Sequence, residues 1–187
     1  MEDTDKVKYT ASFITATLIF ILTQSSIAVA AVGLDLYYPL YTFEPTTLNG
    51  YGFGVWYDPE KFSWKNFRLY FETDYYHWWV TRTTFYHSTS VFSIVPILRY
   101  EFKNSSTLVP YLEISIGPAY FTKNRLEYRR LGGHVLFQDR IGIGATLGKT
   151  KNFSIELDAL HFSNGSFCDR NSGITVPVML NIGYRFL

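Results

Sequence analysis

A histidine and a serine stand two residues apart in the segment His161-Phe162-Ser163-Asn164. On a β-strand, residues two apart project from the same face, so the side chains of His161 and Ser163 would be neighbours. An imidazole beside a serine hydroxyl can act as a general base and make that hydroxyl a nucleophile. Acyl transfer also needs donors for the oxyanion, and Asn164 and the backbone N–H of Gly165 follow directly. The spacing alone is a weak signal, because the rim of a membrane barrel can carry such a pair without catalysis.

The segment ends one of several stretches in which apolar and polar residues alternate. In the clearest stretch, apolar side chains occupy every second position from Val178 to Phe186, and Asn181, Gly183 and Arg185 lie between them. Seven further stretches alternate in the same way, at residues 33–40, 50–57, 67–74, 92–102, 112–120, 140–147 and 155–159. Alternation over about ten residues is typical of strands in membrane barrels. The chain is therefore predicted to be all-β, an eight-stranded antiparallel transmembrane β-barrel.

The polar face of these stretches decides between two kinds of barrel. It carries charges of both signs, at Arg68, Glu72, Asp74, Arg99, Glu101, Glu113, Arg140, Glu156, Asp158 and Arg185. In a small membrane barrel such groups fill the lumen as paired charges beside glycines that save space. On the lipid side each Arg would cost about 2–4 kcal/mol at the midplane. The alternative, a soluble lipocalin-like barrel, would be apolar inside and polar outside.

The first thirty residues read as a targeting segment. Lys6 and Lys8 precede an apolar run from Ala11 to Leu22, and Ala28-Val29-Ala30 offers small residues for cleavage before Ala31. The run is too short for a membrane-spanning helix, which needs about 20 residues. We expect residues 1–30 to be a cleaved signal peptide and residues 31–187 to form the barrel, in the outer membrane of a bacterium.

The expected connections alternate in length, as in outer-membrane barrels. Residues 103–106 and 149–152 are predicted to be short turns, and residues 75–90, 122–133 and 165–174 longer external connections. With both termini periplasmic, Ser163 would lie near the outer leaflet. The first long connection holds His77, Trp78 and Trp79, which we interpret as an interfacial anchor, with substrate binding as the alternative. The second holds Arg125, Arg129 and Arg130, either a solvated cluster or a contact for lipid phosphates.

Composition argues against several other functions. The formal net charge is +1 without a basic block, so nucleic acid is not an expected partner. The single cysteine, Cys168, cannot form an internal disulfide, and is either an incidental thiol or half of an intermolecular bridge. No cluster in the sequence suggests a metal site, and no cofactor is expected. Membrane lipid is the expected partner, and the barrel is expected to be a monomer or a homodimer.

Two segments of the C-terminal half resemble a known family. His161-Phe162-Ser163-Asn164 followed by Asn171-Ser172-Gly173-Ile174 is similar to the strand end and loop of the lipid A 3-O-deacylase (PagL) family. Residues 110–121 and 137–144 also resemble two of that family's strands. The resemblance implies an outer-membrane barrel that hydrolyses an ester-linked acyl chain of lipid A, the anchor of lipopolysaccharide. It implies Ser163 as nucleophile and His161 as base, on the lipid-facing wall.

The resemblance also implies a departure at the third catalytic position. The family's glutamate falls on Thr175, which can accept a hydrogen bond from the imidazole but cannot stabilise an imidazolium as a carboxylate does. Alternation counted back from Val178 puts Thr175 on the other face, although Pro177 can disturb the ladder there. Asp169 is the nearest carboxylate that could substitute. Three hypotheses stand: an enzyme with Asp169 as surrogate acid, a slow Ser–His enzyme, or a non-catalytic barrel with a structural or adhesion role.

Overall fold

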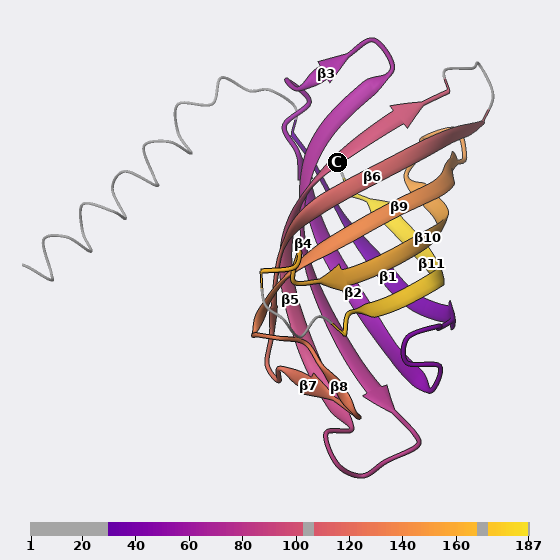
Figure 1. The fold of residues 1–187 in the computed structure, drawn as a ribbon. Coiled ribbons are helices and arrows are strands. Elements are labelled where there is room, and N and C mark those ends of the chain that lie inside the picture. Colours follow the sequence, from indigo (N-terminus) through magenta and orange to yellow (C-terminus); the bar gives the residue numbers. More distant parts are fainter. Residues whose placement is uncertain (1–29, 103–106, 168–171, 187) are drawn as a thin grey trace, which may run out of the picture.

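Eight long antiparallel strands close into a barrel in the computed structural model, which describes residues 30–102, 107–167 and 172–186 (Figure 1). Each strand pairs with the next one along the chain, and pairing of the first with the last closes the ring. The barrel strands are β1 (Ala31–Tyr41), β2 (Leu48–Asp58), β4 (Phe67–Val80), β5 (Ser88–Glu101), β6 (Leu108–Phe121), β9 (Val135–Leu147), β10 (Phe153–Ser163) and β11 (Ile174–Arg185). The predicted fold class is confirmed. The predicted signal peptide lies outside the described residues, apart from Ala30.

Alternation along the strands sets which side chains face out. Leu112 and Ile143 are exposed on the outer wall, whereas Arg99, Glu113 and Arg140 point inward and are buried or nearly so. This orientation is the one that lipid requires, because an inward charge can find a partner and an outward apolar group contacts hydrocarbon. In the part of the chain that the structure describes, no helix is long and apolar enough to span a bilayer.

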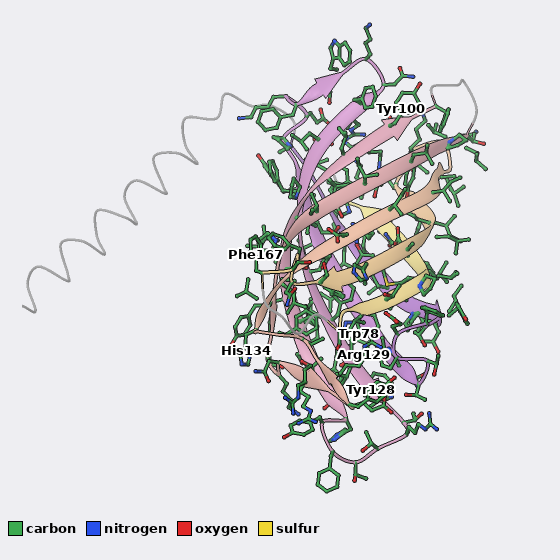
Figure 2. The ribbon with its side chains drawn as sticks, in the orientation of Figure 1. Trp78, Tyr100, Tyr128, Arg129, His134 and Phe167 are labelled. Carbon is green, nitrogen blue, oxygen red and sulfur yellow. The ribbon has the colours of Figure 1, made fainter. Side chains whose placement is uncertain are left out.

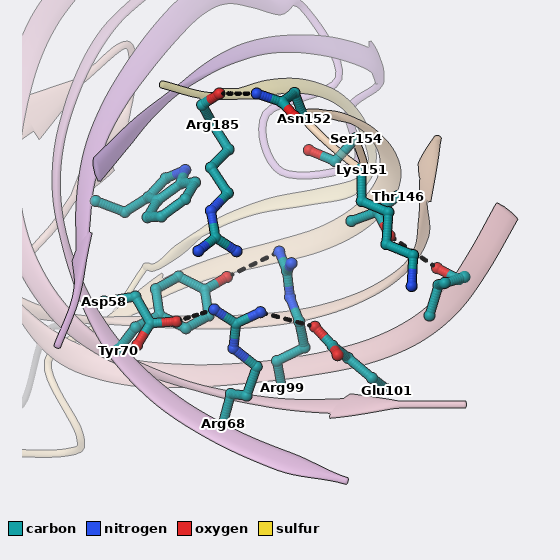
Figure 3. A pocket seen from close by; sticks show the side chains of 12 residues that line it. Asp58, Arg68, Tyr70, Arg99, Glu101, Thr146, Lys151, Asn152, Ser154 and Arg185 are labelled. Carbon is teal, nitrogen blue, oxygen red and sulfur yellow. Dashed lines mark hydrogen bonds and ion pairs between the residues drawn. The ribbon is translucent and has the colours of Figure 1, made fainter. Parts of the chain in front are cut away.

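Paired charges fill the half of the barrel nearer the termini. Arg68 forms ion pairs with Asp58 and Glu101 beside a cavity of only about 90 Å³, which Arg99 also lines (Figure 3). Arg99 forms a further ion pair with Glu113. Deeper inside, Arg140 pairs with Glu72, and both side chains are at most 2% exposed. A Cβ atom at Gly142 would collide with Glu156 and Asp158, so glycine there leaves room for the lumenal carboxylates. The charged lumen predicted from the sequence is present in this half.

The other half of the lumen is apolar, which alternation alone did not predict. Its buried side chains include Tyr76, Trp78, Phe121, Leu160 and Phe162. Leu126 and Leu131, from the connection between β6 and β9, are fully buried against this cluster and close the end of the barrel. That connection contains two short paired strands, β7 (Arg125–Leu126) and β8 (Arg129–Arg130) (Figure 1).

The predicted long connection at residues 75–90 is wrong in extent. Strand β4 continues to Val80 and β5 starts at Ser88, so the connection spans residues 81–87. Trp78 is not an interfacial anchor, because it is fully buried and stacks on Tyr76 inside the barrel. His77 and Trp79 do face outward, where both contact Tyr51.

The remaining connections agree better with the sequence. Residues 149–152 form the predicted short turn between β9 and β10, while the predicted turn at 103–106 lies outside the described residues. Residues 59–66, between β2 and β4, contain the short strand β3 (Ser63–Trp64).

Candidate active site

Four polar side chains form one row across the outer wall of the barrel. His161 on β10 pairs with Thr175 on β11 and with Asp139 on β9, and Thr175 pairs on its other side with Glu44. Residues directly opposite each other on paired antiparallel strands share a face, with Cβ atoms about 4.5–5.5 Å apart. Glu44, Thr175, His161 and Asp139 therefore follow one another around the barrel. Ser163 lies two residues beyond His161 on β10, so it is on the same face.

An irregularity in β11 turns Thr175 outward. Asp158 pairs with Met179 but Leu160 pairs with Val176, so two residues of β11, Pro177 and Val178, lie opposite one residue of β10. An extra residue of this kind shifts the alternation of its strand and re-aims the side chains beyond it. The outward positions are even-numbered after the irregularity and odd-numbered before it. The alternation counted back from Val178, which placed Thr175 on the inner face, is thus reversed at Pro177, and Thr175 lies on the outer wall.

The imidazole of His161 is held on one side by Thr175. Its Nδ1 lies 3.0 Å from Thr175 Oγ1, within hydrogen-bond distance. When Nδ1 carries the proton and donates a hydrogen bond to Thr175 Oγ1, Nε2 is unprotonated. Nε2 can then accept the proton of a serine hydroxyl. Gly173 gives the ring its room, because a Cβ there would lie 3.0 Å from His161 Cε1 and 2.5 Å from the carbonyl oxygen of Phe162.

The polar row is set in an apolar wall. Ile116, the partner of Asp139 on β6, is 61% exposed, and Ile141 and Leu157 beside the row are 60% and 48% exposed. Ser163 lies opposite Phe137, whose ring contacts Phe167. A row of four polar side chains among exposed apolar ones is unusual on the outer wall of a membrane barrel and marks a candidate functional site.

Arg129 fixes the backbone that leads into Thr175. Its Nε donates to the carbonyl oxygens of Ser172 (2.8 Å) and Gly173 (2.9 Å), and its Nη2 pairs with Glu44 Oε2 at 3.1 Å. The backbone N–H of Thr175 also donates to the carbonyl of Glu44 at 2.9 Å. Arg129, a predicted substrate contact, is thus engaged within the protein and supports the site from behind.

The other predicted site residues are placed as follows. Asn164 is buried; its Oδ1 accepts a hydrogen bond from the Ser166 N–H (3.0 Å), so its side chain shapes the turn after β10 rather than lining the wall. Gly165 occupies that turn with a positive φ of 60°. Arg125 and Arg130 lie together on the β7–β8 hairpin, opposite each other. Asp169 and Cys168 lie outside the described residues.

The sequence reasoning missed Asp139 and Glu44. Asp139 could have been found, because alternation counted back from Ile141 puts it on the outer wall beside the strand of His161. Glu44 had no such signal, since it lies between β1 and β2 and reaches Thr175 only through an isolated bridge. Among the described residues, no group of three or more His, Cys, Asp or Glu side chains could hold a metal ion.

Known proteins resemble the chain in both sequence and fold. A model of the family described as Lipid A 3-O-deacylase (PagL) matches residues 49–185. Lipid A deacylase PagL of Pseudomonas aeruginosa is 35% identical over 82 residues, which are 44% of this chain and 46% of that relative. The chain thus aligns with about half the length of this curated relative.

Two solved structures share the fold. The outer membrane enzyme PagL has a TM-score of 0.61 and 24% identity, over 83% of this chain and 99% of that one. Neisserial surface protein A has a TM-score of 0.54 and 14% identity, over 84% and 97% of the two chains. At these identities the structures show a common barrel and no more.

The family match extends over most of the barrel and includes Asp139, His161, Ser163 and Thr175, while Glu44 falls before it. A closed barrel with an apolar exterior is the architecture of integral outer-membrane proteins. The chain is therefore an integral outer-membrane protein, and it belongs to the lipid A 3-O-deacylase (PagL) family.

Proposed function

We propose that the protein hydrolyses an ester-linked acyl chain of lipid A, at the 3-O position that the family name specifies, with Ser163 as nucleophile and His161 as base. One observation carries the proposal: His161 lies on the outer wall within hydrogen-bond distance of Thr175 and two residues from Ser163 on the same strand. A substrate whose acyl chains lie in the bilayer can reach this wall laterally. The exposed Ile141 and Leu157 would contact those chains beside the polar row.

The proposed reaction uses the two side chains in turn. Ser163 Oγ attacks the ester carbonyl carbon while His161 Nε2 takes the hydroxyl proton. The bond between the acyl carbon and the sugar oxygen then breaks, and the imidazolium gives the proton to the departing sugar oxygen. Water, activated by the same imidazole, next attacks the acyl-serine, which releases the fatty acid and restores the Ser163 hydroxyl. Backbone N–H groups in the turn after Ser163 are the proposed donors to the oxyanion.

The acid of a serine triad has two tasks, which this site divides between residues. Thr175 serves the first, because its hydroxyl lies within hydrogen-bond distance of Nδ1 and can accept a hydrogen bond from an Nδ1–H, which orients the ring. The second task is to stabilise the imidazolium, and we assign it to Asp139. This residue lies directly opposite His161 on the neighbouring strand β9. The proposal therefore replaces Asp169, which the sequence suggested, with Asp139. Glu44 is a weaker candidate because Arg129 neutralises its charge.

The direct test is the mass of lipid A from cells that express the barrel. Loss of one hydroxyacyl chain is expected with the unaltered protein, and intact lipid A with Ser163→Ala. Ser90→Ala is the matched control, because Ser90 Oγ also lies near a histidine on the outer wall, 3.0 Å from His77 Nδ1. This control should leave deacylation unchanged.

The competing hypothesis is a barrel without catalytic activity. Intact lipid A in cells that contain a folded, heat-modifiable barrel would support it and exclude the proposed hydrolase. Deacylation that survives Ser163→Ala but is lost in Ser90→Ala would move the activity to the His77–Ser90 pair.

A further inference from the structure

The β7–β8 hairpin presents two different faces. Leu126 and Arg129 are paired on one face and turn toward the barrel, where Leu126 is fully buried and Arg129 holds the backbone before Thr175. Arg125 and Arg130 are paired on the other face. The hairpin lies at the end of the barrel away from the C-terminus, the end at which Figure 2 labels Tyr128 and Arg129. One small element thus supports the candidate site and carries two further arginines.

Arg125 and Arg130 form an uncompensated pair of positive charges. Like charges directly opposite each other on paired strands are destabilising. Neither guanidinium forms an ion pair with any carboxylate in residues 30–102, 107–167 and 172–186. Arg125 is held over the ring of Tyr86, with Cζ 4.5 Å from the ring centroid. Its Nε is buried and makes no hydrogen bond to the described residues.

Both arginines open onto one cavity. Its volume is about 330 Å³, and it is lined by Tyr86, Asn124, Arg125, Arg130 and Gly132. The backbone N–H of Glu127 donates to the carbonyl of Tyr86 at 2.8 Å, which joins the hairpin to the connection between β4 and β5. The cavity is therefore lined by two guanidinium groups and the side-chain amide of Asn124.

We propose that this cavity binds a phosphate monoester of the lipid A headgroup and so positions the substrate whose ester is cut at Ser163. A phosphate would neutralise both arginines and satisfy the buried Nε of Arg125, and planar guanidinium groups match phosphate oxygens in bidentate fashion. The hairpin is joined to the site, since the Ser172 N–H donates to the carbonyl of Arg130 at 3.2 Å. The inference rests on the proposed function for its substrate, but its binding test needs no catalysis.

The binding test uses the full-length Ser163→Ala barrel in detergent micelles. Titration calorimetry would compare bisphosphorylated lipid A with lipid A from which the phosphates have been removed. Arg125→Gln/Arg130→Gln should weaken binding of phosphorylated lipid A about 10- to 100-fold and leave binding of the dephosphorylated lipid unchanged. Arg82→Gln/Lys123→Gln is the matched control, because it removes the same charge from exposed positions near the same end of the barrel.

Each result decides the proposal. Equal weakening in the two double variants would overturn it, because charge alone would then explain the effect. Equal affinity of the unaltered cavity for both lipids would overturn it as well. Inorganic phosphate at millimolar concentration is the third arm: displacement of lipid A supports a phosphate site, whereas saturable phosphate binding without displacement would reassign the cavity to free phosphate.

A kinetic arm separates positioning from chemistry in the protein with Ser163 intact. The Arg125→Gln/Arg130→Gln variant should raise KM for phosphorylated lipid A and change kcat by less than about twofold. Heat-modifiable migration would show that the variant barrel is folded. If the unaltered protein has no hydrolase activity, the proposed function fails, while the calorimetric comparison still tests the phosphate site.

Discussion

Thr175 Oγ1 lies 3.0 Å from His161 Nδ1, at the position where the resemblance to the family leads us to expect a glutamate. The hydroxyl can fix the orientation of the ring but carries no charge. Thr175→Glu should therefore raise kcat for lipid A deacylation by at least about tenfold. The gain should be smaller than the ~10⁴-fold loss seen when a triad carboxylate is removed elsewhere, because the proposal assigns part of that charge to Asp139. Thr175→Val should lower kcat. A Thr175→Val enzyme with unaltered kinetics would show that the hydrogen bond does not orient the base.

Asp139 is expected to stabilise the imidazolium that forms on His161. Two opposite charges about 6–8 Å apart at an effective dielectric constant of about 20 interact by about 2–3 kcal/mol. Asp139→Asn should accordingly reduce kcat about 30- to 100-fold with little effect on KM. Glu44→Gln is the comparison, because its carboxylate is paired with Arg129 and should matter far less to kcat. A larger loss in Glu44→Gln than in Asp139→Asn would reverse the assignment.

Gly173 is predicted to be required for the position of the His161 ring and hence for activity. Gly173→Ala would place a Cβ 2.5 Å from the Phe162 carbonyl oxygen and 3.0 Å from His161 Cε1, so the backbone beside His161 must shift and the ring must move with it. Deacylation should fall at least about tenfold, because a displacement near 1 Å can cost about 100-fold. Gly133→Ala serves as control, since its Cβ would meet no atom closer than 4.0 Å. Full activity in Gly173→Ala would mean that the ring position is not limiting.

The buried pair of Arg140 and Glu72 should dominate the stability of the barrel interior. Both side chains are at most 2% exposed, and Arg140 also donates to the hydroxyl of Tyr37. Arg140→Met leaves Glu72 uncompensated and should lower the free energy of unfolding by about 3–5 kcal/mol, measured by urea titration in detergent micelles. Adding Glu72→Gln should recover much of that loss. No recovery in the double variant would show that Arg140 acts through other carboxylates of the lumen.

Much of the fold was predictable because every second residue of a membrane-spanning strand faces lipid and is therefore apolar. The alternation from Val178 to Phe186 gave both the strand and its outward face, and the structure keeps that orientation. The prediction failed where both faces of a strand are apolar. In β4 the inward Tyr76 and Trp78 and the outward Tyr75 and Trp79 erase the alternation, so the end of the strand was predicted as a loop.

The candidate site was predictable in its central pair and less so in its surroundings. His161 and Ser163 follow from strand periodicity, since β10 keeps a single alternation to its end. Thr175 faces outward because two residues of β11 lie opposite one residue of β10. The register between two strands cannot be read from the sequence of either strand alone. Glu44 reaches the row through tertiary pairing that no local pattern encodes.

The filled interior of the barrel has a consequence for molecular traffic. Apolar and aromatic side chains occupy one half of the lumen and charged side chains the other, so the lipid substrate and the acyl product of the proposed reaction would exchange sideways with the surrounding leaflet. Encounter then depends on two-dimensional diffusion and on how crowded the leaflet is. Turnover should consequently respond to the surface density of lipid more than to the bulk concentration of any solute.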